Sequence, residues 1–142
     1  MQEARRPRLS LQELATFLDD TFPIDARPSL GELISVEAGH VRMRLLPLPS
    51  MERPGRIVSG PSLMALVDVA AYAVVAAHHG PEAMAVTSSL SISFLRTCRF
   101  EPVFADAELL KLGRRLATVD VRVWQQEEAR LIAQSTVGYS LP

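Results

Sequence analysis

The sequence predicts a single α+β domain in which an antiparallel sheet wraps around one long buried helix. The run from Leu63 to Ala77 contains no glycine or proline, and its only polar side-chain atoms belong to Asp68 and Tyr72. The chain on both sides of this run alternates apolar and polar residues with period two, which is typical of half-buried strands. A length of 142 residues suits one domain, so we expect one unit over 1–142.

Composition excludes several classes of function. Lys and Arg number 15 and Asp and Glu number 16, so the net charge of −1 provides no basic field for nucleic acid or an anionic membrane. The single cysteine, Cys98, cannot form an internal disulfide, and no Cys/His cluster has zinc-ligand spacing. The N-terminal segment is amphipathic and acidic rather than a continuous apolar run, so it does not resemble a signal peptide. We expect a cytoplasmic protein with no metal.

The first elements are a short helix and a hairpin. Ser10 and Glu13 have capping-box spacing, and the leucines that follow have helical periodicity, which predicts a helix over 10–20. Residues 30–48 change to period two, and Ala38-Gly39 forms a plausible tight turn between two strands.

The central helix is expected over 62–79, after a loop rich in proline and glycine. A helix that is apolar on nearly every side is either a membrane span or buried by protein. The uninterrupted apolar run is shorter than the ~20 residues of a span, so we expect burial. His78 and His79 end this helix, where a positive charge suits the helix dipole.

Four strand-like runs follow the break at Gly80-Pro81, separated by turn-forming residues. They cover 83–95, 103–112, 116–125 and 131–139. In the third run valines alternate with polar residues, which suits an antiparallel sheet with one buried face. A hairpin, a long apolar helix and four more strands, with the sheet curved around the helix, is the layout of the hotdog fold.

Asp68 is the first candidate for chemistry because it lies in the middle of the apolar helix. An ionised carboxylate left unpaired in an apolar environment costs on the order of several kcal/mol, so this group requires a partner, solvent or a changed protonation state. Tyr72 lies one turn later on the same face. From the residues alone, a packing role and a catalytic role for Asp68 are both open.

Three segments together resemble the PaaI-like branch of hotdog acyl-CoA thioesterases. They are RPGRIVSGPSLMALVDVA (53–70), AVTSSLSISFLR (85–96) and LLKLGRRLATVDVRVW (109–124). This family shows a His-Gly-Gly turn at the helix start, an acid nine positions after the histidine, a Val-Thr-x-x-Leu-x-Ile-x-Phe-Leu-Arg strand and a Gly-Arg-Arg turn. Here the corresponding positions of the helix start are Ser59, Gly60, Pro61 and Asp68, and the resemblance covers about residues 30 to 141.

The resemblance implies roles for several residues in thioester hydrolysis. Asp68 would be the general base or the nucleophile, and the Gly60 N–H would stabilise the oxyanion. Thr87 stands where relatives place a hydroxyl near the nucleophile, and Ser88 and Ser89 follow it. Strand alternation would place Thr87 and Ser89 on one face. Without the resemblance, Ser59-Gly60-Pro61 is an ordinary helix-start turn.

Besides Pro61 at the second glycine, two positions that bear on activity depart from the family pattern. Ser59 replaces the usual histidine, and Arg53 stands where many relatives have Asn or Gln, six positions earlier. Arg53 would either pair with Asp68 of the same or a neighbouring subunit or remain a solvated loop residue.

The resemblance also implies a substrate and an assembly. Coenzyme A would enter as part of an acyl-CoA, without a separate cofactor, and its phosphates would meet Arg114 or Arg115, which otherwise form an ordinary charged hairpin turn. Met64 and Tyr72 would line an acyl tunnel or serve only in the core. Subunits would pair edge to edge into a homodimer or homotetramer, with each interface site built from the Gly60 and Asp68 regions of different subunits.

Other classes of function are weighed against hydrolysis. A non-catalytic hotdog protein that binds acyl-CoA or a related ligand, or only mediates assembly, is the main rival, supported by the missing histidine. A hydratase would need a histidine in the loop before the helix, where none occurs. A DNA-binding repressor would need a helix-turn-helix, for which the roughly 25 residues before the first strand are too few.

Overall fold

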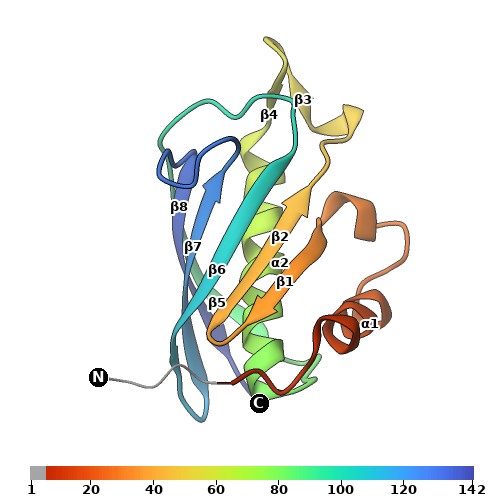
Figure 1. Cartoon of the computed structure of the whole chain (residues 1–142), viewed down its shortest axis with the longest axis vertical. Coiled ribbons are helices and arrows are strands. Elements are labelled where there is room, and N and C mark those ends of the chain that lie inside the picture. The colour runs from red at the N-terminus through yellow and green to blue at the C-terminus, as the bar shows by residue number, and fades with distance from the viewer. Residues whose placement is uncertain (1–5) are drawn as a thin grey trace.

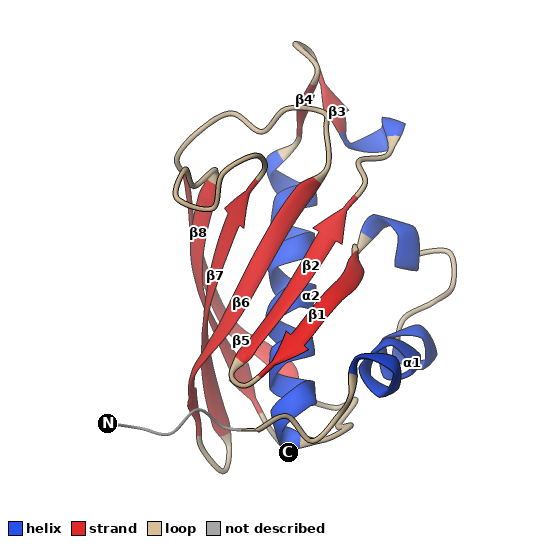
Figure 2. Ribbon diagram, in the orientation of Figure 1, coloured by secondary structure: helices blue, strands red, loops and turns tan. Residues whose placement is uncertain are grey.

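The computed structural model describes residues 6–142 and confirms the predicted fold class. Six strands form one antiparallel sheet in the order β1-β2-β6-β7-β8-β5, which curves around a single long helix (Figure 1; Figure 2). The helices are α1 (Leu11–Thr21) and α2 (Gly60–His79), with short 3-10 turns at Arg27–Ser29 and Pro49–Met51. The strands of the main sheet are β1 (Glu32–Glu37), β2 (His40–Leu45), β5 (Val86–Phe94), β6 (Val103–Leu112), β7 (Leu116–Trp124) and β8 (Ala133–Ser140). A separate two-stranded sheet pairs β3 (Glu52–Arg53) with β4 (Ile57–Val58).

Helix α2 is the core of the molecule and begins two residues earlier than the sequence predicts. Its length of 20 residues and its hydropathy would suit a membrane span, so the argument from length does not hold. Burial decides the question, because 67% of its most apolar window is enclosed by the rest of the chain. The helix ends at Gly80, whose φ of 115° is accessible to glycine at little cost.

Period-two alternation in β6, β7 and β8 supplies the other half of the core. The inward-facing side chains of these strands are mostly small or β-branched and fully buried, which lets α2 pack closely against the sheet. On β7 these are Ala117, Val119, Val121 and Val123. The alternating partners on the same strand face outward, as the sequence pattern predicts.

The two edges of the main sheet differ in how they are covered. Helix α1 begins with the predicted capping box, in which the Ser10 Oγ accepts the Glu13 N–H at 3.1 Å and Glu13 Oε1 accepts the Ser10 N–H at 3.0 Å. It packs beside β1, with Leu14 and Leu18 fully buried (Figure 1). Strand β5 lies at the opposite edge, and no strand of the described chain pairs with its free side.

His78 does not carry the positive charge that its position at the helix end suggests. Its side chain is buried, and its Nε2 accepts the Gly39 N–H at 2.8 Å while Nδ1 donates to the Val74 carbonyl at 2.8 Å. A backbone N–H can only donate, so Nε2 carries a lone pair and the imidazole is neutral. The role of His78 is structural, because this histidine ties the last turn of α2 to the β1–β2 hairpin turn.

A polar network on the outer face of the sheet joins three strands. Asp106 on β6 accepts hydrogen bonds from His40 Nε2 (2.6 Å), from Arg42 Nε (2.8 Å) and from the Trp124 indole N–H. Burial raises the pKa of the Asp106 carboxyl, but these three hydrogen bonds outweigh that effect and lower it to about 2. The same contact with Asp106 raises the pKa of His40.

We expect Asp106→Asn to destabilise the protein by about 2 kcal/mol at neutral pH, from the difference between a pKa of about 2 and the ordinary 3.8. Because the folded pKa is the lower one, this stabilisation is fully present above the ordinary pKa and is lost as pH falls through the folded pKa. Urea denaturation of both proteins from neutral pH to about pH 2 measures it. If the difference in free energy of unfolding between wild type and Asp106→Asn stays constant across this pH range, the lowered pKa of Asp106 would be contradicted.

Candidate active site

Asp68 is held by two hydroxyl donors that come from strands at the β5 side of the sheet. Its Oδ1 accepts the Thr87 hydroxyl at 2.7 Å, and the Tyr139 hydroxyl lies 2.5 Å from the same oxygen and 2.9 Å from the Asp68 carbonyl. Thr87 and Tyr139 are paired across β5 and β8, so the sheet register brings both to one place. Oδ2 has no hydrogen-bond partner within residues 6–142. The carboxylate is therefore oriented through one oxygen and leaves the other available.

Tyr139 is the site residue that sequence reasoning missed. Its side chain is 2% exposed, and burial, followed by the negative charge of Asp68, raises the pKa of its hydroxyl well above the usual range. The phenol is therefore a permanent hydrogen-bond donor at neutral pH. In the sequence it is one more inward-facing residue of the last strand, and its only signal is an aromatic residue with a polar tip on a buried face.

Tyr72 does not hydrogen bond to Asp68, although it lies one turn away on the helix. Its hydroxyl donates to the Ala83 carbonyl at 3.2 Å, and its ring stacks on Phe17 with centroids 5.9 Å apart. It forms part of the wall of a pocket of about 280 Å³ that opens beside Asp68. The remaining lining is mostly apolar and comprises Thr21, Phe22, Val69, Ala83, Ala85, Val86, Thr87 and Tyr139.

The start of α2 presents one free backbone donor. The Ser59 hydroxyl caps the helix by accepting the Ser62 N–H at 3.3 Å, and it also lies 2.7 Å from the Ser62 hydroxyl. Pro61 has no N–H, and the Leu63 N–H bonds to the Ser59 carbonyl at 3.2 Å. The Gly60 N–H has no partner within the described chain and lies at the positive end of the helix dipole. The Ser59 hydroxyl is thus engaged in capping α2, and the Gly60 N–H is the donor available to a ligand.

Gly60 lies against the aromatic ring of Phe94. A Cβ placed on it would lie 3.4 Å from the ring of Phe94 at the end of β5. The two candidate catalytic groups, however, do not meet within one chain. Asp68 follows Gly60 by 68 − 60 = 8 residues on a continuous helix, a separation of about 12 Å.

A β-bulge corrects the expected orientation of the serines on β5. The register shifts between Thr87, which pairs with Tyr139, and Ser89, which pairs with Gly138, so Thr87 and Ser89 face opposite sides of the sheet. A Cβ on Gly138 would lie 2.7 Å from the Ser89 Oγ and 3.0 Å from the Ser88 Oγ. Both serines therefore lie over Gly138, away from Asp68, because the extra residue of the bulge interrupts alternation.

The arginines of the sequence analysis lie apart from Asp68. Arg53, on β3, is exposed and forms no ion pair within the described chain. Arg114 and Arg115 form the β6–β7 turn, at the opposite end of the sheet from Gly60, where they line a surface hollow with Lys111. Pro61 and Met64 are exposed on the first turns of α2, and Met64 shares a helix face with Asp68.

Neither a thiol nor a metal centre competes with Asp68. Burial raises the pKa of the Cys98 thiol to about 12, so this thiol is not a thiolate at neutral pH. Within residues 6–142, no group of three or more His, Cys, Asp or Glu side chains is placed to hold a metal ion.

The protonation of Tyr139 and Tyr72 can be tested directly, because they are the two tyrosines of the chain. Burial raises the pKa of both hydroxyls, so we expect neither to be half ionised near pH 10, where a free tyrosine is. Tyrosinate absorbance during alkaline titration measures this, with the same titration in denaturant as the control. Half ionisation of the folded protein near pH 10 would contradict the hydrogen-bonded site.

The comparisons with known proteins show the family and the fold of the chain. The model of the thioesterase superfamily matches residues 55–132. A protein from Silicibacter sp. TM1040, assigned as a thioesterase, is 34% identical, with 99% of this chain and 96% of that chain covered and a TM-score of 0.87. No protein with a curated description matches the chain.

Two more distant solved structures share the fold. Zebrafish thioesterase superfamily member 2 is 21% identical, with 94% of this chain and 99% of that chain covered and a TM-score of 0.81. The PaaI protein of the E. coli phenylacetic acid degradation operon is 18% identical, with coverage of 91% and 95% and a TM-score of 0.74. The chain therefore belongs to the thioesterase superfamily and is a PaaI-like hotdog protein.

Proposed function

We propose that the protein hydrolyses the thioester bond of a small or medium acyl-CoA, with Asp68 as the general base or the nucleophile. The observation that carries this proposal is the carboxylate itself, which two hydroxyl donors hold through Oδ1 while Oδ2 remains free beside an apolar pocket. Membership of the thioesterase superfamily supports a thioester hydrolase. Coenzyme A enters as part of the substrate, and we place the enzyme in the cytoplasm.

Either role of Asp68 gives a balanced reaction. As a general base, Oδ2 takes a proton from water while the water oxygen bonds to the thioester carbon. As a nucleophile, Oδ2 itself bonds to that carbon to form a mixed anhydride, which water then hydrolyses. In both cases the carbon–sulfur bond breaks and coenzyme A leaves as the thiol after taking a proton. The donors on Oδ1 fix the direction in which Oδ2 points.

The proposal assigns the oxyanion to the Gly60 N–H, which is free and lies at the positive end of the α2 dipole. Because about 12 Å of helix separates Gly60 from Asp68 in one chain, the two act together only across an interface. We therefore propose a homodimer, on its own or within a homotetramer, with two equivalent sites that each combine Asp68 of one copy with Gly60 of the other.

The surface beside β5 supports such a dimer. The free edge of β5 exposes unpaired backbone groups, a feature that proteins normally cover. Large apolar side chains lie along and beside the same edge and are about half exposed: Met64 (40%), Val86 (56%), Phe94 (49%) and Leu95 (55%). Pairing of two β5 strands would satisfy the edge and bury these side chains.

The pocket beside Asp68 supports a short or aromatic acyl group. Its volume of about 280 Å³ is near the lower end of the usual range for ligand pockets, and the rings of Phe22 and Tyr72 form part of its wall. An acyl chain that enters here brings its carbonyl carbon to Asp68 Oδ2.

One observation favours a second candidate, a hotdog protein that binds acyl-CoA without hydrolysing it. The Ser59 hydroxyl, at the position of the family histidine, is engaged in capping α2 and offers no group to a substrate. Arg53, at the second altered position, is exposed and forms no ion pair with Asp68 of its own chain.

Release of free thiol from short, medium, long and aromatic acyl-CoAs distinguishes the two candidates. We expect wild type to hydrolyse at least one class and Asp68→Asn to lose activity by about 100-fold or more, the usual contribution of a general base. Asp20→Asn, an exposed acid on α1, is the matched control and keeps full activity. Circular dichroism and size-exclusion chromatography check that each variant folds and assembles.

Two results would contradict hydrolysis at Asp68. Full activity in a folded Asp68→Asn would remove the carboxylate from the mechanism. Absence of hydrolysis in wild type that still binds acyl-CoA would establish the binding protein instead.

Mixed dimers test the interface site separately. We expect Asp68→Asn and Gly60→Pro, which removes the N–H, each to be inactive as homodimers. In a heterodimer one site carries both changes and the other carries neither, so activity returns when the two chains are co-expressed with different tags and purified together. A heterodimer as inactive as both homodimers would show that each site draws Asp68 and Gly60 from one chain.

A further inference from the structure

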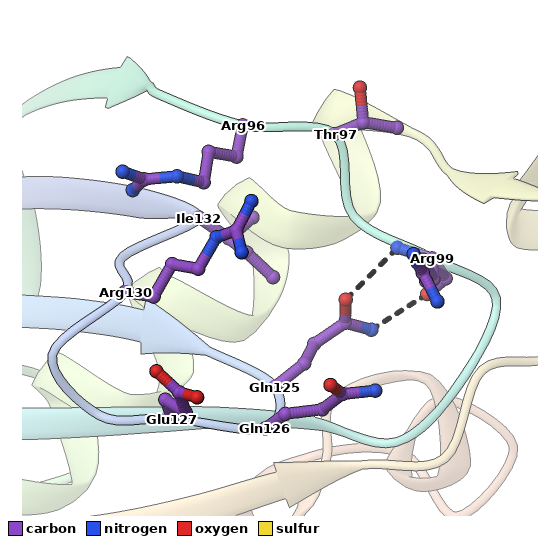
Figure 3. Close-up of a pocket in the computed structure, with 8 residues that line it drawn as sticks. All are labelled: Arg96, Thr97, Arg99, Gln125, Gln126, Glu127, Arg130 and Ile132. Atoms are coloured by element: carbon purple, nitrogen blue, oxygen red, sulfur yellow. Dashed lines mark hydrogen bonds between the residues drawn. The ribbon is translucent and has the colours of Figure 1, made fainter.

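A second pocket, of about 450 Å³, lies between the β5–β6 connection and the β7–β8 connection (Figure 3). Its volume falls within the usual range for small-molecule sites. Its lining differs from that of the pocket beside Asp68, because charged and amide side chains predominate. The polar residues that matter for its chemistry are Arg96, Thr97, Arg99, Gln125, Glu127 and Arg130.

The net charge of the residues that line this arginine pocket is positive. Arg96, Arg99 and Arg130 face a single acid, Glu127, and within the described chain none of the three guanidinium groups forms an ion pair. Other arginines of the molecule, such as Arg42, are paired with carboxylates. Three arginines that line one cavity with a single acid are suited to an anionic ligand, and guanidinium groups bind phosphate in a bidentate manner.

The backbone that carries these arginines is fixed before any ligand arrives. The Gln125 side-chain amide accepts the Arg99 N–H at 3.0 Å and donates to the Arg99 carbonyl at 2.8 Å, which clamps the two connections together (Figure 3). Arg96 donates through its guanidinium to the Leu131 carbonyl at 2.6 Å, and its N–H bonds to the Ile132 carbonyl at 3.2 Å. A preformed frame of this kind lowers the entropy cost of binding.

The arginine pocket lies at the same end of the molecule as the Gly60 N–H. Phe94, which contacts Gly60, is two residues from Arg96, and Arg99 forms a β-bridge with Ile57, three residues before Gly60. Arg114 and Arg115, by contrast, lie at the far end of the β6–β7 hairpin (Figure 1). The position therefore favours the pocket over that turn as the place where the carrier of the thioester is held.

We propose that the arginine pocket binds the phosphate groups of the adenine nucleotide of coenzyme A. This inference rests on the proposed function, because it takes the thioester carrier to be coenzyme A, and it replaces the expected role of Arg114 and Arg115. The carrier anchor and the oxyanion donor then belong to one protomer and are joined by the short segment from Phe94 to Arg96. Substrate affinity is set at the arginines, whereas bond cleavage is set at Asp68.

Calorimetric titration with coenzyme A, adenosine 3′,5′-bisphosphate and pantetheine tests the proposal without any need for hydrolysis. We expect Arg96→Gln/Arg130→Gln to weaken binding of the first two probes by at least about tenfold, since each lost charge-assisted hydrogen bond contributes roughly that factor. Binding of pantetheine, which lacks the phosphates, should not change. Arg122→Gln is the matched control, because this arginine lies on the outer face of β7 beside Asp120, and it should bind all three probes as wild type does.

Kinetics separate this inference from the proposed function. With an acyl-CoA that wild type hydrolyses, the double variant should raise KM with little change in kcat, whereas Asp68→Asn lowers kcat. If no acyl-CoA is hydrolysed but coenzyme A binds through the arginines, the inference stands and the proposed function fails.

Three results would overturn the inference. The first is that Arg96→Gln/Arg130→Gln binds coenzyme A as tightly as wild type. This holds also if Arg114→Gln/Arg115→Gln is found to weaken binding. The second is an equal loss in Arg122→Gln, which would indicate a general charge effect. The third is binding of pantetheine as tight as that of coenzyme A, which would show that the phosphates contribute nothing.

Discussion

The structure depends on burying a helix that is apolar on nearly every side and yet carries a carboxylate in its middle. Helix α2 is stable only because the sheet curves around it, and the sheet packs closely on the helix because β6, β7 and β8 present small inward side chains. Asp68 constrains this packing, since it requires donors. The β5–β8 register places Thr87 beside Tyr139, and the hydroxyls of these two residues are the donors. The correct alignment of the last strand therefore also satisfies the carboxylate.

Incomplete wrapping of α2 accounts for both the reactive group and the exposed edge. The sheet covers the helix chiefly with β2, β6 and β7, while the helix face that bears Met64 and Asp68 remains partly open beside β5. Asp68 is partly exposed on this open face, and its Oδ2 accepts no hydrogen bond from the described residues. An open edge therefore leaves room for a substrate and, at the same time, leaves apolar surface that a second copy would cover.

The fold was predictable because it follows from local periodicity in the sequence. Parts of the site were not predictable, because they are formed by contacts between residues far apart in the sequence. The apolar run of α2, the capping box at Ser10 and the alternation of β7 depend on neighbouring residues, so the sequence contains them directly. Tyr139 lies 71 residues from Asp68 in the sequence, and only the packing of β8 beside α2 makes it a partner of that carboxylate. The bulge that turns Ser88 and Ser89 outward and the acceptor role of His78 also follow from contacts between distant segments, which no spacing rule records.

The arginine pocket was also not predictable from the sequence. Arg96 and Arg130 line the same pocket only because the loop that joins β5 to β6 lies beside the loop that joins β7 to β8. The sequence offered Gly-Arg-Arg at the β6–β7 turn as the more visible basic motif, yet proximity to Gly60 argues for the less visible cluster.

The presence of Ser59 in place of the family histidine affects how a substrate could be oriented. A serine cap satisfies the Ser62 N–H and leaves the Gly60 N–H as the free donor, but it provides no side chain to orient a thioester. In the proposed enzyme, orientation then falls to the two ends of the substrate, the acyl group in the pocket beside Asp68 and the phosphates at the arginines. Binding energy from these remote contacts would hold the carbonyl carbon near Asp68 Oδ2.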